Sequence, residues 1–245
     1  MGFFYYNRLK INFEILKKGD NLNFYDYHYP LYSSILKCIE IINPSLSEEI
    51  HSGNIKRAFI YSNIIFNKKN IKKANKAHIY ITSAHKEVLF SIIKGLNLTK
   101  QIKINDIIYS IKNIKNEIYE LKKITKFNIL SPIILRNKDG TTLNEITKED
   151  FEEKVKESIK RITNKLKLSG EFDIRYLGKK LRPKLFNIKG TNIRAFEATS
   201  SKDTIEIRGS DLAKIVALYF GIGDKTNFGF GMLGIPKTIG GTDNV

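Results

Sequence analysis

Apolar residues in the first half of the chain follow two different periods, which predict strands and helices in a fixed order. Residues 8–15 alternate polar and apolar side chains, the pattern of a half-buried strand. Apolar side chains then recur at helical spacing over residues 31–42, and Asn43-Pro44 ends this helix because the residue before a proline disfavours helical backbone angles. Later runs predict a strand at 58–66, a strand at 78–82, a helix at 88–96 and a strand at 104–111. The predicted order is β-α-β-β-α-β.

The second half of the chain repeats this order. An interrupted strand at 127–135 precedes an amphipathic helix that begins near Thr147 and ends by Gly170. The remaining runs predict a strand at 172–176, strand-like residues at 195–208, a helix at 212–219 and a strand at 230–235. Two such halves are typical of an α+β protein with tandem ferredoxin-like domains. We place the boundary in the charged stretch 112–126, which gives an N-terminal domain at 1–118 and a C-terminal domain at 119–245.

The composition adds a strong positive charge. The sequence contains 42 Lys and Arg against 25 Asp and Glu, a formal net charge of +17. Such a surplus favours a polyanionic partner, most simply nucleic acid, although an ordinary lysine-rich surface accounts for part of it. A basic membrane-surface protein is the competing class, but the sequence has no strongly amphipathic basic helix.

Cysteine content and hydropathy limit the compartment. The single Cys38 excludes an internal disulfide and a cysteine-based zinc site. No apolar run approaches the ~18 residues of a membrane span, and the first residues lack the basic start and long apolar core of a signal peptide. We therefore expect a cytoplasmic protein that does not enter a membrane.

A basic segment at 178–194 is the best candidate for a nucleic-acid-binding hairpin. It contains no acidic residue, and an aromatic residue, Phe186, stands among its basic ones. Basic side chains contact phosphates and an aromatic ring stacks on a base, whereas the alternative is a solvated lysine-rich hairpin. The basic residues are Lys179, Lys180, Arg182, Lys184, Lys189 and Arg194.

Two Gly-x-Gly pairs follow the last predicted helix. Glycine is favourable mainly where φ is positive or another backbone comes close, so four glycines at fixed offsets indicate a loop wrapped against another surface. A helix C-cap and a tight turn would explain a single pair. The glycines are Gly221, Gly223, Gly229 and Gly231, and Lys225 lies between the pairs.

The glycine pattern, continued by Met232, resembles the glycine-rich loop of the repeat-associated (RAMP) superfamily. Asn43-Pro44, His51 and residues 58–62 resemble the Asn-Pro…His…Phe-x-x-Ser segment of the CRISPR-associated endoribonucleases of the Cas6 family. Residues 131–133, Ser-Pro-Ile, are similar to the element that opens the second domain of that family. The resemblance covers nearly the whole chain.

This resemblance implies two ferredoxin-like domains and a metal-independent endoribonuclease that binds CRISPR repeat RNA and cleaves precursor crRNA. The 2′-hydroxyl upstream of the scissile bond attacks the phosphate and leaves a 2′,3′-cyclic phosphate and a 5′-hydroxyl. No cofactor is expected, and the protein would act as a monomer or homodimer. The alternative is a non-catalytic RAMP subunit that binds crRNA beside the proteins of a CRISPR effector complex. A general double-stranded RNA or DNA binder is a third possibility.

The resemblance also assigns roles to residues. It makes His51 the general acid/base and gives the cation that stabilises the phosphorane to Lys56 or Arg57, with the choice left open. Some members carry a catalytic tyrosine where this chain has Leu36, so the second proton transfer stays unassigned. Tyr32 and Tyr29, one turn or more earlier, are the nearby candidates, and Ser33 or Ser34 are weaker ones.

Two further expectations concern histidines and the glycine loop. His28 is the alternative acid/base, and no pair among the four histidines has metal-ligand spacing near a cysteine or a carboxylate cluster, so no metal site is expected. Backbone N–H groups of the glycine loop, together with Lys225, would hold the RNA backbone, while the loop also packs the domains together.

Overall fold

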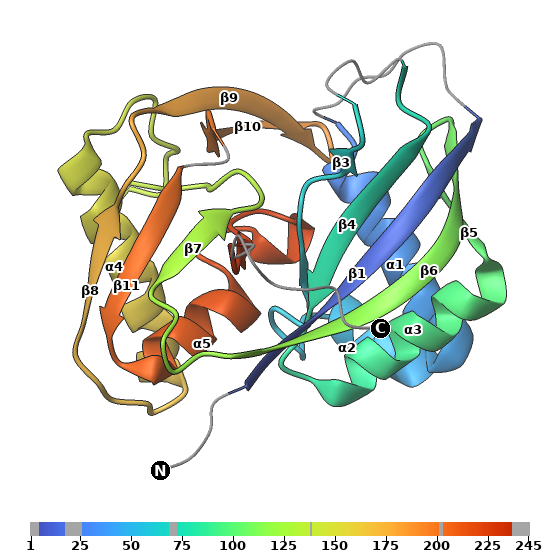
Figure 1. The fold of residues 1–245 in the computed structure, drawn as a ribbon, viewed down its shortest axis with the longest axis horizontal. Coiled ribbons are helices and arrows are strands. Elements are labelled where there is room, and N and C mark those ends of the chain that lie inside the picture. The colour runs from blue at the N-terminus through green and yellow to red at the C-terminus, as the bar shows by residue number, and fades with distance from the viewer. Residues whose placement is uncertain (1–4, 18–25, 69–72, 138, 201–202, 237–245) are drawn as a thin grey trace.

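The computed structural model describes residues 5–17, 26–68, 73–137, 139–200 and 203–236, and these form two α+β domains side by side (Figure 1). The expected fold class, two tandem ferredoxin-like domains, is confirmed by the order of the strands in each sheet. Among the described residues, no helix is both long enough and apolar enough to cross a membrane.

The N-terminal domain has a sheet with the strand order β2-β4-β1-β6-β5, and β3 pairs with β4 beside β2. The central strand β1 lies antiparallel between β4 and β6, as the first strand of a ferredoxin-like unit does. The elements are β1 (Tyr5–Lys17), α1 (His28–Ile42), α2 (Pro44–His51), β2 (Ile60–Tyr61), β3 (Ile65–Phe66), β4 (Lys76–Thr82), α3 (Lys86–Thr99), β5 (Gln101–Ile104) and β6 (Ile107–Glu120).

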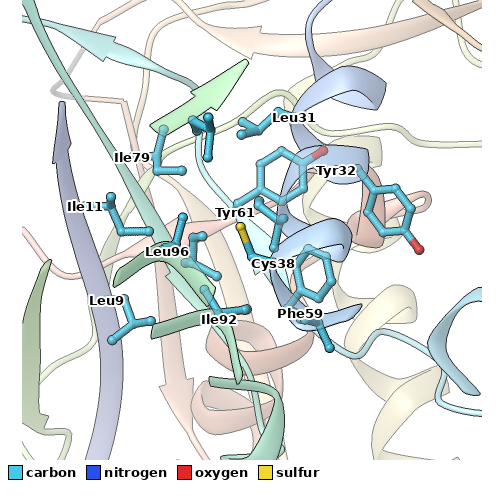
Figure 2. Packing of buried hydrophobic residues seen from close by; sticks show 14 of the residues in the cluster. Leu9, Ile11, Leu31, Tyr32, Cys38, Phe59, Tyr61, Ile79, Ile92 and Leu96 are labelled. Carbon is cyan, nitrogen blue, oxygen red and sulfur yellow. The ribbon is translucent and has the colours of Figure 1, made fainter. Parts of the chain in front are cut away.

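The alternation predicted for residues 8–15 sends every second side chain of β1 into the first hydrophobic core. Leu9, Ile11 and Phe13 are buried there with residues of α1 and α3. Figure 2 shows Leu9 and Ile11 facing Ile92 and Leu96 across this core. The helices therefore cover one face of the sheet.

The C-terminal domain has a four-stranded sheet with the order β12-β7-β11-β8 and a separate two-stranded hairpin. The hairpin is inserted between the second and third strands of the ferredoxin-like unit, and it extends from this domain toward the N-terminal one (Figure 1). The elements are β7 (Lys126–Ile129), α4 (Lys148–Lys165), β8 (Phe172–Tyr176), β9 (Leu181–Ile188), β10 (Thr191–Ala198), β11 (Thr204–Gly209), α5 (Asp211–Phe220), the 3₁₀ turn η2 (Thr226–Phe228) and β12 (Leu233–Gly234).

Several predicted boundaries were wrong. The run at 104–111 is divided by a turn at Asn105, where φ is +51°, and β6 continues to Glu120 because it pairs along the whole of β1. The charged stretch after residue 111 is thus mostly strand. The division at 118/119 stays a prediction; it falls inside β6, and Leu121 already packs in the second core.

Candidate functional site

The site begins at α2, the short helix that presents His51. The Asn43 side chain accepts a hydrogen bond from the backbone N–H of Leu46 at 3.0 Å, and Pro44 occupies the first turn, so this helix has a well-defined start. His51 is its last residue and is exposed. Gly53, at φ +83°, then turns the chain toward β2.

A cavity of about 250 Å³ lies next to this turn. Tyr32 comes from α1, Lys56 from the segment after α2, and Asn227 from the glycine loop of the other domain. The residues on either side of the turn, Ile50 and Gly53, also line the cavity, whereas the exposed His51 is not among its lining residues. The cavity therefore brings together both domains beside His51.

Lys56 and Arg57 have different environments. Arg57 adopts φ +56° and donates hydrogen bonds to the carbonyl oxygens of Phe220 and Gly223, both at 3.2 Å. Its partial burial lowers the pKa of the Arg57 guanidinium. Lys56 is exposed and lines the cavity. Arg57 therefore connects the two domains through these hydrogen bonds, whereas the side chain of Lys56 is exposed to solvent.

Tyr32 is 8 % exposed, and its ring stacks on Phe59 with the centroids 5.5 Å apart. Figure 2 shows its hydroxyl directed away from the core cluster, and burial raises the pKa of the Tyr32 phenol. Leu36, one turn later, packs against the first core. Of these two positions, only Tyr32 lines the cavity.

His28 was a candidate acid/base, and the structure contradicts that role. Its side chain is 0 % exposed, with the ring stacked between Tyr27 and Phe230 at centroid distances of 4.5 Å each. Nδ1 lies 3.1 Å from the carbonyl oxygen of Phe228, so Nδ1–H is the donor. Burial lowers the pKa of His28 to about 4. A ring enclosed in this way cannot reach a substrate, and it serves domain packing instead.

The glycine loop, residues 221–231, requires its glycines because other groups come very close. All four have positive φ, between +71° and +79°. A Cβ on Gly231 would lie 1.8 Å from the carbonyl oxygen of Ile222, and one on Gly229 would lie 2.2 Å from the ring of Tyr61. Tyr61 belongs to the other domain, so the predicted packing role of the loop has a direct physical basis.

Several backbone N–H groups that were expected to hold the RNA backbone are used inside the protein. The amides of Ile222, Gly223, Asp224 and Gly231 donate to Gly231 O, Ser158 Oγ, Ile134 O and Pro132 O at 2.7–3.0 Å. These donors are used inside the protein, and the four glycines are buried. Lys225 is exposed, so its side chain is still accessible to a polyanion.

The basic hairpin formed by β9 and β10 also differs from the prediction in one respect. Phe186 is 3 % exposed and packs edge-on against His28 and Phe230, so its ring is not accessible for stacking on a base. Lys184 pairs with Glu197, and Arg194 donates to Asn144. The basic residues of the hairpin that are exposed are Lys179, Lys180, Arg182 and Lys189.

Lys189, at the tip of the hairpin, places its ammonium group 4.7 Å from the centre of the Tyr29 ring. This cation–π contact reaches the first helix of the other domain. Within the described part of the chain there is no group of three or more His, Cys, Asp or Glu side chains able to hold a metal ion.

Comparison with known families decides the relationship. The model of CRISPR-associated protein Cas6, N-terminal, matches residues 23–115, and the model of CRISPR associated protein Cas6, C-terminal, matches residues 112–235. The chain belongs to the Cas6 family. The resemblance expected from the glycine pattern and the Asn-Pro…His segment is thereby confirmed.

Relatives of this Cas6 family chain match along nearly their whole length. It is 26% identical over 249 residues to CRISPR-associated endoribonuclease Cas6 1 of Methanocaldococcus jannaschii, covering 92% of this chain and 93% of that one. It is 26% identical over 244 residues to a Cas6 endoribonuclease-like protein of Pyrococcus furiosus, covering 93% and 98%. A solved RAMP protein described as binding different RNA substrates has a TM-score of 0.73 at 21% identity, with 95% and 100% covered, which shows the shared fold.

Sequence reasoning missed Asn227, which lines the cavity from within the glycine loop. The only available signal was its place between the two glycine pairs, because the loop folds back onto the N-terminal domain far from it in sequence. The placement of the other Cas6 site candidates leaves their chemical roles as predictions.

We predict that Gly231→Ala lowers the free energy of unfolding by about 3 kcal/mol or more, because the added methyl group overlaps the carbonyl of Ile222. Gly190→Ala is the matched control. Gly190 has a similar φ of +78°, but no atom lies within 4 Å of the place a Cβ would take, so only the cost of about 1 kcal/mol for the backbone conformation applies. Urea unfolding measures both; equal losses would show that close approach does not matter.

We also predict an acid-dependent loss of stability from His28. The folded-state pKa is about 4, below the ordinary 6.5. The unfolded chain therefore binds more protons between these values, and stability falls as pH falls from 6.5 toward 4. The contribution is about 2.5 kcal/mol between pH 7 and pH 4.5.

Urea unfolding of the native protein and of His28→Phe at several pH values tests this. The variant should lose less stability over that range, since the buried imidazole of His28 is absent. His51→Ala, at an exposed position, should keep the native pH dependence. Parallel pH profiles for the native protein and His28→Phe would contradict the assignment.

Proposed function

We propose that this chain is an endoribonuclease that cleaves precursor CRISPR RNA within its repeats. The observation that carries the proposal is the match of the two Cas6 family models, which together extend over residues 23–235. The proteins with 26% identity over more than nine-tenths of the chain are named as endoribonuclease or endoribonuclease-like. The surplus of basic residues supports an RNA substrate.

The proposed reaction needs no metal ion. The 2′-oxygen forms a bond to the adjacent phosphorus while the bond from phosphorus to the 5′-oxygen breaks, which leaves a 2′,3′-cyclic phosphate and a 5′-hydroxyl. One group accepts the proton of the 2′-hydroxyl, another donates a proton to the leaving 5′-oxygen, and a cation stabilises the charge of the phosphorane.

His51 is the proposed proton-transfer group. It is exposed at the end of α2, and the residues flanking its turn line the cavity. A neutral imidazole accepts a proton and an imidazolium donates one near neutral pH, so this residue type suits either transfer. Tyr32, which lines the same cavity, is proposed for the second transfer.

Lys56 is proposed as the cation. It is exposed and lines the cavity, whereas the Arg57 guanidinium is occupied by two carbonyl oxygens. A freely positioned ammonium group can approach a phosphate without breaking other contacts. Arg57 is proposed to hold the glycine loop against the cavity instead.

One observation favours a second candidate function, a RAMP subunit that binds crRNA in an effector complex without cutting it. Tyr32 is only 8 % exposed and Leu36 is packed in the core, so the second proton transfer has no freely accessible tyrosine at either position. Tight binding of repeat RNA without a product would favour this reading.

We predict that incubation with repeat RNA in EDTA gives a single cut, because the mechanism uses only protein groups and the 2′-hydroxyl. A 2′-deoxy substitution at the cut site or His51→Ala should abolish it. His85→Ala is the control, since it removes another exposed histidine, one that lies at the start of α3 and not beside the turn at Gly53. Cleavage that requires added magnesium would contradict the mechanism, and an active His51→Ala variant would contradict the assigned residue.

We predict that replacing Lys56 affects the cleavage rate, whereas replacing the neighbouring Arg57 affects the stability. Lys56→Ala should lower the cleavage rate at saturating RNA by about 10² or more with unchanged stability, because it removes charge stabilisation from the transition state. Arg57→Ala should lower the free energy of unfolding by about 2 kcal/mol or more, because two buried carbonyl groups lose a charged donor. Single-turnover kinetics and urea unfolding separate the two; the reverse pattern would exchange the roles.

A further inference from the structure

Asp224 of the glycine loop lies between two arginines from other parts of the C-terminal domain. Its Oδ2 is 3.4 Å from Nε of Arg136, and its Oδ1 is 3.4 Å from a terminal nitrogen of Arg161 on α4. The backbone N–H of Asp224 donates to Ile134 O at 2.9 Å, which fixes the position of the carboxylate. Three segments therefore meet at one acidic side chain.

A third arginine is close to this group. The Asp224 carboxylate raises the pKa of Arg57, and the Arg161 guanidinium lowers it. Both groups are therefore close enough to Arg57 to interact with its charge. Arg136 and Arg161 contact the one carboxylate and leave a surplus of one positive charge, to which Arg57 adds another from the neighbouring cavity. Lys154 and Glu157 line the same hollow and carry opposite charges, so they do not change this balance.

The two ion pairs are weak ones. The side chains of Asp224, Arg136 and Arg161 are 23%, 33% and 55% exposed, and both contacts are longer than a good charge-assisted hydrogen bond. Exposed pairs of this kind contribute about 0–1 kcal/mol each. A stronger bidentate acceptor, such as a phosphate, can take both guanidinium groups at little cost.

This cluster lines a second cavity of about 340 Å³, which also includes Gly223. Arg57 lines the first cavity and donates to the carbonyl oxygen of Gly223, which belongs to the second. The two cavities thus lie on either side of one contact between the N-terminal domain and the glycine loop. Groups that line the two cavities are therefore in direct contact.

We propose that Arg136 and Arg161 form a phosphodiester subsite for the RNA strand on one side of the scissile bond. Asp224 holds the two guanidinium groups in place in the free protein and is displaced from them by the phosphate. This subsite rests on the proposed function for the position of the cut, but its test measures binding and does not depend on cleavage.

The test is the affinity of a single-repeat RNA, carrying a 2′-deoxy nucleotide at the cut if the native protein cleaves it. Arg136→Gln with Arg161→Gln should raise Kd at least tenfold. The slope of log affinity against log salt should become shallower by about 1.4, since each lost phosphate contact on a single strand removes about 0.7. An unchanged Kd and slope would overturn the proposal.

Lys156→Gln with Lys160→Gln is the matched control. It removes the same formal charge, in this case from two residues of α4, the helix that carries Arg161, in the neighbouring groove lined by Asp173. Its Kd should change less than threefold. An effect equal to that of the arginine variant would show general charge attraction and overturn a specific subsite.

Asp224→Asn separates a phosphate subsite from a structural ion pair. Because it removes the competing carboxylate, it should leave the affinity unchanged or increase it. A loss of affinity equal to that of the arginine variant would overturn the proposal. If the native protein binds the repeat RNA without cutting it, the proposed endoribonuclease function fails, while the same three variants still decide the subsite.

Discussion

The close approach of backbone to backbone at the glycine loop is the constraint on which the rest of the site depends. The carbonyl of Ile222 occupies the space where any side chain at Gly231 would begin, and the ring of Tyr61 does the same at Gly229. The first contact closes the loop on itself, and the second joins this loop to the N-terminal domain at a residue that has no side chain. The cavity beside His51 exists because Asn227, carried by this loop, lies against Tyr32 and Lys56.

Tight packing determines what the loop can do chemically. The amides of Ile222, Gly223, Asp224 and Gly231 donate to carbonyl and hydroxyl acceptors within the protein, which removes these four as donors for an external phosphate. Side chains that the loop orients remain accessible to a polyanion, since Asn227, Lys225 and Asp224 are all at least partly exposed. The loop acts as a support for side chains.

The elements of both domains could be predicted because their signals are local. Alternation at residues 8–15 and the apolar stripe from Phe151 to Ile162 depend only on which side chains face a core, and the structure has β1 and α4 at these positions.

The burial of His28 and Phe186 could not be predicted in this way. Their rings meet Phe230 in a cluster formed by segments about 200 residues apart, as the contact from His28 to Phe228 shows. Burial of this kind appears only when the domains are docked. The sequence leaves the choice between Lys56 and Arg57 open for the same reason. The two residues differ because Arg57 donates hydrogen bonds to two carbonyl oxygens of the other domain.

The net charge read from the sequence does not show where positive charge is concentrated on the folded protein. The net charge of +17 is spread over the chain, yet Lys184 and Arg194 in the basic hairpin are engaged by Glu197 and Asn144. The local surplus at Asp224 instead arises from arginines that the sequence scatters over more than a hundred positions. A polyanion responds to the potential at its own contact surface, which falls off within about 10 Å at ordinary ionic strength. The folded arrangement around the loop, more than the total charge, therefore determines how strongly a polyanion is attracted there.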